Sequence, residues 1–376
     1  MLKRRLQNIF RLGIKELWSL WRDPAMLLLI VYIFSLSVYT GATAVPDTLH
    51  MAAIAVVDED QSPLSRRVAD AFYPPLFSPP AHITRDEMDA GLDQGRYSFV
   101  LNVPPNFQRD VLAERQPELQ LNVDATRMAQ AFSGSGYVQQ IALGEVRDYA
   151  QRHRGESAAP VELALRARFN PALEKSWFGA LMQIIDNVTL VGIILTGAAL
   201  IREREHGTVE HLLVMPLTPT EIMLGKVWSM GLVVLVAAWL SLRFVIGSLL
   251  NVPVAGSVPL FLTGAALNLF ATTAMGIYLA TLARTMPQFG LLMILTIFPM
   301  QMLSGGTTPR ESMPQIVQDL MLAAPPTHFV EIGQAVLFRG AGLETVWPQM
   351  AALALIGSVL FALALARFRK TIGQMA

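Results

Sequence analysis

Two histidines and a glutamate lie close together in a short polar run near the middle of the chain. His206, Glu210 and His211 are residue types that bind zinc and transfer protons. Zinc proteases place such residues in the order H-E-x-x-H or H-x-x-E-H. The spacing here is H-x-x-x-E-H, which matches neither order. The run therefore does not indicate a metal site, and we expect no metal ligand in it.

Four acidic residues, Asp58, Glu59, Asp60 and Asp124, are also of a type that can bind a metal ion. Their spacing does not form a calcium-binding loop, so we interpret them as turn carboxylates at strand ends. The chain has no cysteine and no G-x-x-x-x-G-K-[ST] motif. These two absences exclude disulfides, thiol chemistry and a phosphate-binding loop of that type. If ATP drives this protein, we expect another polypeptide to bind it.

The polar run itself has the sequence of a short structured element. Gly207 can end the preceding helix, and Thr208 can cap a new one with Glu210 in its first turn. Apolar residues follow, and Pro216 ends the segment. Residues 218–221 then form a capping box that starts the next helix. A short amphipathic helix between two long apolar segments is suited to docking on a partner protein.

Residues 203–213, EREHGTVEHLL, resemble the coupling-helix motif of the ABC-2 type transporter permease family. The resemblance covers nearly the whole chain and includes residues 55–60, 304–306, 309, 313–314 and 325–329. It implies the membrane subunit of a bacterial ATP-driven exporter, of a drug-efflux-like subgroup with a large periplasmic domain. In that reading the chain is not an enzyme, binds no cofactor, and does not bind nucleic acid.

The resemblance also implies partners. Cytoplasmic ABC ATPase subunits would bind ATP and magnesium, and the chain would form a homodimer or pair with a similar permease subunit. The periplasmic domain suits transfer of substrate to an adaptor and an outer-membrane channel. The residues expected to couple to the ATPase are Glu203, Arg204, Glu205, Gly207, Thr208, Glu210, Leu213, Met215 and Pro216.

Composition independently indicates an α-helical polytopic membrane protein. Hydrophobic residues make up 53% of the chain and charged residues 15%, with a mean hydropathy of +0.42. A helix needs about 20 apolar residues to cross the hydrocarbon core. Six segments are predicted to cross, the fifth being short and carrying Pro299. The six are 25–45, 180–201, 227–250, 258–283, 288–303 and 347–366.

Basic residues in the short loops predict the orientation. They gather before the first crossing, in the second-to-third loop and in the C-terminal tail, so both termini are expected in the cytoplasm. The family resemblance implies that the membrane is the inner membrane of a bacterial cell. Residues 1–24 alternate apolar and basic residues at helical spacing, which predicts an interfacial helix on the bilayer. A cleaved signal peptide ending near residues 42–44 is the alternative.

Residues 46–177 are predicted to form a periplasmic α/β domain inserted after the first crossing. Strands are expected at 52–57, 97–103 and 119–123, and helices after Ser62, after Thr84, after Pro105 and over 128–153. Alternating strands and helices are typical of a compact α/β domain. The loop at 73–80 is rich in proline and aromatic residues and could touch the membrane or a partner.

Residues 178–376 are predicted to hold the remaining crossings, the coupling helix at 208–216, and an outer re-entrant hairpin at 304–340 whose two apolar helices are too short to span. A plain periplasmic loop is the alternative for this hairpin. Polar residues near the outer ends of the crossings are candidates for a substrate path or outer gate. They are Asp186, Asn187, Arg243, Ser304, Gly305, Gly306 and Glu331.

The role of Asp186 and Arg243 depends on how deep each residue lies in the membrane. Each lies about 25 Å along its helix from the cytoplasmic end, at about 1.5 Å per residue, so both fall near the outer interface. There they could reach water, pair with each other, or line the path. For the whole chain, export of a lipophilic or amphipathic substrate is the expected function. The alternative is a membrane receptor or scaffold whose periplasmic domain senses a ligand.

Overall fold

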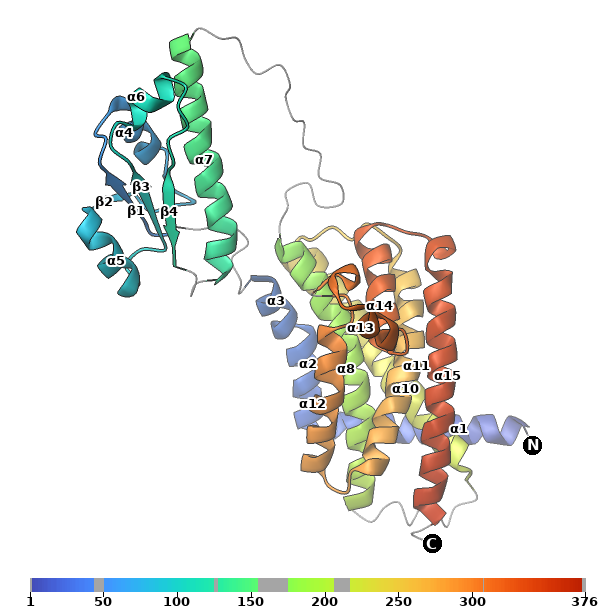
Figure 1. The fold of residues 1–376 in the computed structure, drawn as a ribbon. Helices are drawn as coiled ribbons and strands as arrows, with labels where there is room; N and C mark the ends of the chain where they lie inside the picture. The colour runs from blue at the N-terminus through green and yellow to red at the C-terminus, as the bar shows by residue number, and fades with distance from the viewer. Residues whose placement is uncertain are drawn as a thin grey trace. The chain divides into compact units, whose positions relative to one another are not determined.

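The computed structural model describes residues 2–43, 51–124, 128–154, 175–205, 217–306 and 308–373. The chain divides into two compact units, which are described separately here. An apolar helical unit comprises Met1–Val45 and Ala167–Ala376, and an α/β unit comprises Pro46–Arg166. Figure 1 shows both units, coloured along the chain.

The apolar unit is a bundle of long helices. Its elements are α1 (Leu2–Trp21), α2 (Pro24–Phe34), α3 (Leu36–Thr43), α8 (Lys175–Glu205), α10 (Pro219–Leu240), the π-helical segment η1 (Ser241–Leu249), α11 (Val258–Leu282), α12 (Met286–Met302), η2 (Arg310–Ser312), α13 (Gln315–Met321), α14 (Pro325–Gly333), η3 (Gln334–Phe338) and α15 (Leu343–Gly373). Within the described part of the chain, five helical stretches are long and apolar enough to cross a membrane: Pro24–Thr43, Ser176–Glu205, Pro219–Leu249, Val258–Leu282 and Leu343–Thr371. The fifth of the six predicted crossings, α12, is a shorter apolar helix.

The helices α8 and α11 form the centre of the bundle. The side chains of Ile184, Ile185 and Val188 on α8 are fully buried, because α2, α10, α11 and α14 surround this helix. Small residues bring α8 and α11 close together, since a Cβ atom on Gly276 of α11 would lie 2.7 Å from the carbonyl oxygen of Ile193. Close backbone approach through small residues is how helices pack when lipid surrounds them.

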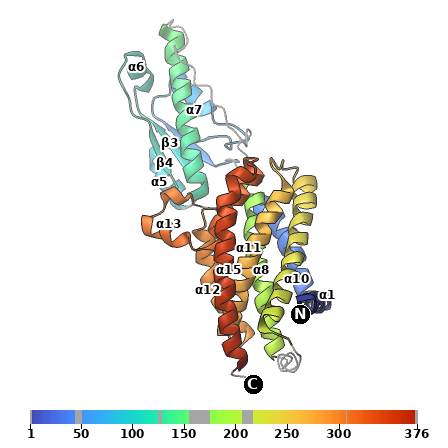
Figure 2. The ribbon, with the colours of Figure 1, turned by 90° about the vertical axis from the view of Figure 1, so that its right-hand side faces the viewer.

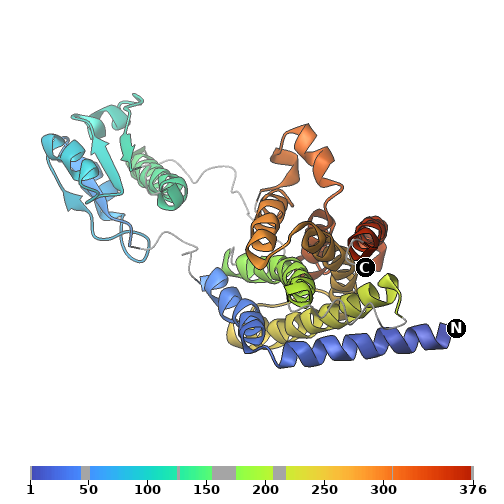
Figure 3. The same cartoon turned by 90° about the horizontal axis from the view of Figure 1, so that it is seen from below.

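The N-terminal helix α1 runs crosswise to the bundle helices (Figures 1 and 3). It packs along α10, where the ring of Phe10 stacks on that of Trp228 with centroids 5.6 Å apart. Gly13 lies directly against the Trp228 ring, so no larger residue fits there. The described α1 thus has the helical conformation and the amphipathic pattern predicted for residues 1–24.

The predicted outer hairpin contains two helices in different environments. The residues of α14 from Pro325 to Val330 are buried, and Phe329 stacks on Phe261 of α11 with ring centroids 5.5 Å apart. By contrast, Ile316 and Leu320 of α13 are among the most exposed apolar side chains of the chain. Figure 2 shows α13 standing out from the bundle. One limb of the hairpin is therefore part of the core, and the other lies on the surface.

The α/β unit contains a four-stranded sheet with the order β2-β1-β3-β4. Its strands are β1 (Ile54–Asp58), β2 (Ala81–His82), β3 (Phe99–Val103) and β4 (Gln120–Val123), and its helices are α4 (Pro63–Asp70), α5 (Arg85–Asp93), α6 (Phe107–Leu112) and α7 (Met128–Arg154). The strands β2, β1 and β3 are parallel, and β4 is antiparallel to β3. Ile54 and Val56 face the core formed with α4, α6 and α7, whereas Ala55 and Val57 face α5. Helices thus cover both faces of the sheet.

The strand and helix predictions for this unit are confirmed, with two differences. The short edge strand β2 was not predicted, because two residues are too few to give a periodic signal. The second difference is that the loop at 73–80 contributes to the core of this unit: its Phe77 is fully buried, edge-on to Phe72 and Phe99, and bridges to Ala52. Tyr73 of the same loop is 67% exposed, so a contact of this loop with a membrane or partner stays a prediction.

The contact between α8 and α11 leads to a stability prediction. Gly276→Ala should lower the free energy of unfolding by about 1–3 kcal/mol, because the new methyl group overlaps the Ile193 carbonyl oxygen and the backbone must shift. Gly290→Ala on α12 is the matched control, since no atom lies within 4 Å of its added Cβ. Thermal unfolding of both variants in one detergent measures this difference. Equal melting temperatures would contradict the close packing.

Candidate functional site

The predicted coupling loop begins and ends in described residues. Helix α8 ends at Glu205 and α10 begins at Pro219. Glu203, Arg204 and Glu205 therefore occupy the last turn of α8. The other predicted coupling residues, Gly207, Thr208, Glu210, Leu213, Met215 and Pro216, lie outside the described residues. The described residues on either side, at the end of α8 and the start of α10, form the stem of this loop.

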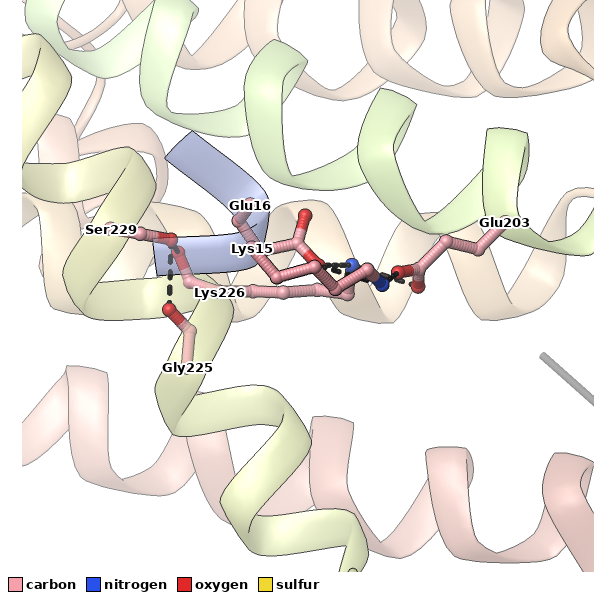
Figure 4. A network of polar contacts seen from close by, with 6 residues as sticks. All are labelled: Lys15, Glu16, Glu203, Gly225, Lys226 and Ser229. Carbon is pink, nitrogen blue, oxygen red and sulfur yellow. Dashed lines mark hydrogen bonds and ion pairs between the residues drawn. The ribbon is translucent and has the colours of Figure 1, made fainter. Parts of the chain in front are cut away.

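Four charged residues from three helices meet at the stem, and we call them the stem cluster: Lys15, Glu16, Glu203 and Lys226. The ammonium Nζ of Lys226 lies 2.9 Å from Glu16 Oε1 and 2.8 Å from Glu203 Oε2. Lys15 Nζ lies 2.7 Å from the other oxygen of Glu203. Figure 4 shows the ammonium groups and the carboxylates converging. Each helix, α1, α8 and α10, thus contributes at least one charge.

Burial makes this cluster energetically important. The side chains of Lys226, Glu16 and Glu203 are 3%, 6% and 11% exposed. A charge removed from water costs several kcal/mol unless an opposite charge compensates it. Two lysines and two glutamates balance in this cluster, and Lys226 contacts both carboxylates. The three helices must therefore stay together for any one of these charges to remain compensated.

The last turn of α8 also forms hydrogen bonds with the turn between α11 and α12. The guanidinium of Arg204 donates to the carbonyl oxygen of Ala283 at 2.6 Å, and the amide of Met286 donates to Glu205 Oε1 at 3.1 Å. Arg202 pairs with Asp23, which caps the start of α2 by accepting from the Met26 amide. Successive polar residues of α8 thus bind three different parts of the bundle.

The outgoing side of the stem begins with the predicted capping box, which is confirmed. The Thr218 amide donates to Glu221 Oε2 at 2.7 Å, and the Glu221 amide donates to Thr218 Oγ1 at 3.3 Å. Asn8 of α1 donates to the other oxygen of Glu221, and Trp228 Nε1 donates to the carbonyl oxygen of Ile9. Helix α1 therefore contacts both sides of the loop stem.

Sequence reasoning did not find the stem cluster as a unit. In the sequence, Lys226 is one of the basic residues near the end of the second-to-third loop, and Glu16 belongs to no recognised motif. One signal was available, because Glu16 is the sole acidic residue among the first 22. Its position on an otherwise basic helix indicates a partner, but the sequence does not identify Lys226 as that partner.

Four of the outer candidate residues meet around one cavity of about 690 Å³ in the apolar unit. Ser304, Gly305, Gly306 and Glu331 all line it, together with Arg310, Gln318, Thr327, Gln334 and Arg339. Glu331 Oε1 accepts from Gln349 Nε2 of α15 at 2.9 Å. Gly305 has a φ of +96°, a conformation that favours glycine at this turn. The lining of this cavity contains both signs of charge, together with apolar side chains such as Phe178 and Phe338.

The remaining outer candidates, Asp186, Asn187 and Arg243, do not line this cavity. Asn187 has a structural contact, because its Nδ2 donates to the carbonyl oxygen of Ile33 at 2.7 Å. The first crossing breaks between α2 and α3 at Ser35, which frees that carbonyl from its helical partner. Arg243 is exposed on η1, and the described residues show no ion pair between it and Asp186.

The acidic residues at the end of β1 are held by turn contacts. Asp58 Oδ1 accepts from the amide of Gln61 at 2.8 Å, and Asp58 Oδ2 accepts from the Ser65 hydroxyl at 2.8 Å. Asp60 Oδ2 accepts from the amide of Gln108. These carboxylates thus order the loop after β1 and start α4, as expected for turn residues.

The stem cluster predicts non-additive mutational effects. Lys226→Met should lower the free energy of unfolding by about 3–5 kcal/mol, because Glu16 and Glu203 lose a buried partner. Adding Glu16→Gln should recover part of this loss, since fewer buried charges then remain unpaired. Lys370→Met, in the exposed last turns of α15, is the control for losing one lysine. Denaturant titration of the detergent-solubilised chain compares the unmodified protein, both single variants, the double variant and the control; strictly additive losses from Lys226→Met and Glu16→Gln would contradict a contact between Lys226 and Glu16.

Comparison with known proteins identifies the family of this chain. Residues 24–366 match the family described as "ABC-2 family transporter protein". The chain is 62% identical over 373 residues to "Inner membrane transport permease YhhJ" of Escherichia coli (strain K12), covering 99% of this chain and all of the relative. It is 28% identical over 375 residues to "Probable multidrug ABC transporter permease YbhR" of the same strain, covering 98% and 99% of the two chains. The chain therefore belongs to the ABC-2 family of transporter permeases, and it is the membrane subunit of a transporter rather than an enzyme.

Proposed function

We propose that this chain is the permease subunit of an exporter that moves a lipophilic or amphipathic, drug-like substrate outward across the inner membrane. Membership of the family implies ATPase partner subunits, which would bind ATP and magnesium in the cytoplasm. One relative is named as a probable multidrug permease, which supports the substrate class. The observation that carries the proposal is the stem cluster at the base of the 206–216 loop.

Coupling by contact requires a loop that transmits displacement into the membrane. An ATPase that moves a loop on a loosely held stem would only bend the stem. Here the stem is held by compensated buried charges, and Glu203 links α8 to α1 and α10 through two lysines. A force on the loop would therefore move the ends of α8, α10 and α1 together, which is the property that coupling needs.

Helix α8 offers a direct connection from the stem to the outer cavity. It has 31 residues, which corresponds to about 46 Å of helix at 1.5 Å per residue. Near its other end, Met182 contacts Gly306 and Ile185 contacts Gly333, and both glycines leave no room for a Cβ atom. A shift of α8 would thus press directly on the residues around the outer cavity and on α14. In this proposal Ser304, Gly305, Gly306 and Glu331 form the outer gate.

The arrangement in the cell follows from the same proposal. The bundle would cross the membrane six times, with α12 as the short fifth crossing, and both termini would lie in the cytoplasm. The α/β unit would then lie in the periplasm, where it could meet an adaptor and an outer-membrane channel. Two such chains, or this chain and a similar permease, would enclose the path. The clustering of basic residues in predicted cytoplasmic loops supports this orientation.

Coupling is tested by reversing one charge in the loop. Glu210→Lys should leave the protein in the membrane but reduce either ATPase association or substrate-stimulated ATP hydrolysis at least ten-fold, because a cation in the first turn of the predicted coupling helix opposes the helix dipole. Glu344→Lys, at the exposed start of α15, makes the same charge change away from the loop. Co-purification of the ATPase and its hydrolysis rate are compared in both variants. Normal coupling in Glu210→Lys would rule out this loop as the contact.

Orientation is tested by labelling cysteines, since the chain has none of its own. Asp89→Cys, exposed on α5, should react with an impermeant thiol reagent in cells whose outer membrane has been made permeable. Arg284→Cys, exposed in the turn between α11 and α12, should react only after the inner membrane is opened. The reverse pattern would place the α/β unit in the cytoplasm and refute the proposed direction of transport.

A further inference from the structure

A cavity of about 480 Å³ lies where α1, α2 and α8 meet, beside the stem cluster. Its polar lining includes Lys15, Ser19, Arg22 and Arg202, together with Glu16, Asp23 and Glu203. Three of these residues, Ser19, Arg22 and Asp23, lie within five positions at the junction of α1 and α2. The cavity therefore opens where an interfacial helix turns into the first apolar helix.

The carboxylates in this lining are already compensated. Glu16 and Glu203 bind Lys226, and Asp23 pairs with Arg202 and caps α2. Arg22 is exposed, and within the described residues its side chain forms no ion pair with an acidic residue. The cavity therefore presents the guanidinium of Arg22 and the hydroxyl of Ser19 to a ligand, beside the half-exposed Lys15 that binds Glu203, and its acids are occupied.

The surroundings are those of a lipid rather than of a small soluble anion. Trp18 and Trp21, on either side of Ser19, are 60% and 71% exposed. Leu28 and Val31 of α2 are 73% and 64% exposed and continue the apolar surface away from the cavity. Tryptophan rings prefer the headgroup region of a bilayer, and such leucine and valine side chains suit acyl chains. A ligand that fits both parts has an anionic head and a long apolar tail.

The charge of α1 favours the same ligand. Residues 1–22 contain six basic residues and one acid, and that acid, Glu16, is buried on Lys226. The accessible charge of α1 is therefore entirely positive in its described part. A basic amphipathic helix of this kind is attracted to anionic lipid, at roughly five-fold in affinity for each cation near the surface.

We propose that the cavity at the junction of α1, α2 and α8 binds the phosphate headgroup of an anionic phospholipid, with Arg22 and Ser19 as its contacts. The acyl chains would lie along the exposed face of α2 that contains Leu28 and Val31. The bound headgroup would neutralise Arg22 next to the stem cluster. This site is separate from the outer cavity and needs neither ATP nor a transported substrate.

The test measures which lipid lies beside the cavity. The full chain carrying Ala25→Cys, an exposed position at the start of α2, is labelled with a fluorophore and reconstituted in bilayers of phosphatidylcholine and phosphatidylglycerol. Quenching by the brominated form of each lipid gives their relative association at this position. We expect phosphatidylglycerol to associate at least five-fold more strongly than phosphatidylcholine.

Matched variants separate a site from diffuse attraction. Arg22→Gln should lower this preference roughly five-fold, and Arg22→Lys should retain most of it. Arg11→Gln removes one exposed cation from the same helix but does not line the cavity, so the preference at Ala25 should remain. Equal quenching by the two lipids in the unmodified chain, or an equal loss in Arg11→Gln and Arg22→Gln, would overturn the proposal. Inorganic phosphate at about 10 mM should leave the preference for phosphatidylglycerol in place. If it abolished that preference, the proposal would be overturned, because the site would then bind a soluble anion.

Discussion

The burial of the Lys226 ammonium group constrains the cytoplasmic end of the bundle as we orient it. An ammonium group so far from water is stable only beside carboxylates, and it has two, from Glu16 and Glu203. These residues lie 210 and 23 positions away from Lys226 along the chain. A single electrostatic requirement therefore holds together α1 and the two helices, α8 and α10, that flank residues 206–216. Apolar packing could not do this as selectively, since apolar side chains accept many neighbours.

The rest of the bundle depends on this stem through α8. The helix is surrounded over most of its length, so it cannot bend toward lipid when its end is displaced. Its polar side chains are used for positioning. Asn187 binds the carbonyl freed by the break in the first crossing, and Thr189 accepts from Asn268 of α11 at 2.9 Å. Hydrogen bonds of this kind between helices are directional, so they fix the register of α8 against its neighbours.

Not all apolar surface in this unit is used for packing. On α12, Leu291, Ile294, Leu295 and Phe298 are 61–70% exposed, whereas Phe289 and Ile297 of the same helix are buried. A helix with an apolar exposed face and an apolar buried face is typical of a bundle in lipid, where the surroundings are as apolar as the core. The uniform hydrophobicity of these helices thus predicts membrane crossing, but it cannot indicate which face of a helix points inward.

Several features of this protein follow from sequence alone because their causes are local. A threonine followed three residues later by glutamate forms a capping box wherever a helix starts, so the helix starts at Pro219 and Arg85 could be predicted. Alternation and turn residues likewise predicted three of the four strands, and the motif at residues 203–213 predicted the family. Contacts between distant residues were decided by tertiary structure. The pairing of Glu16 with Lys226, the burial of α14 beside an exposed α13, and the gathering of Ser304 and Glu331 around one cavity depend on which helix faces meet. In helices that are apolar all round, periodicity contains no information on those faces; only packing of the whole chain selects them.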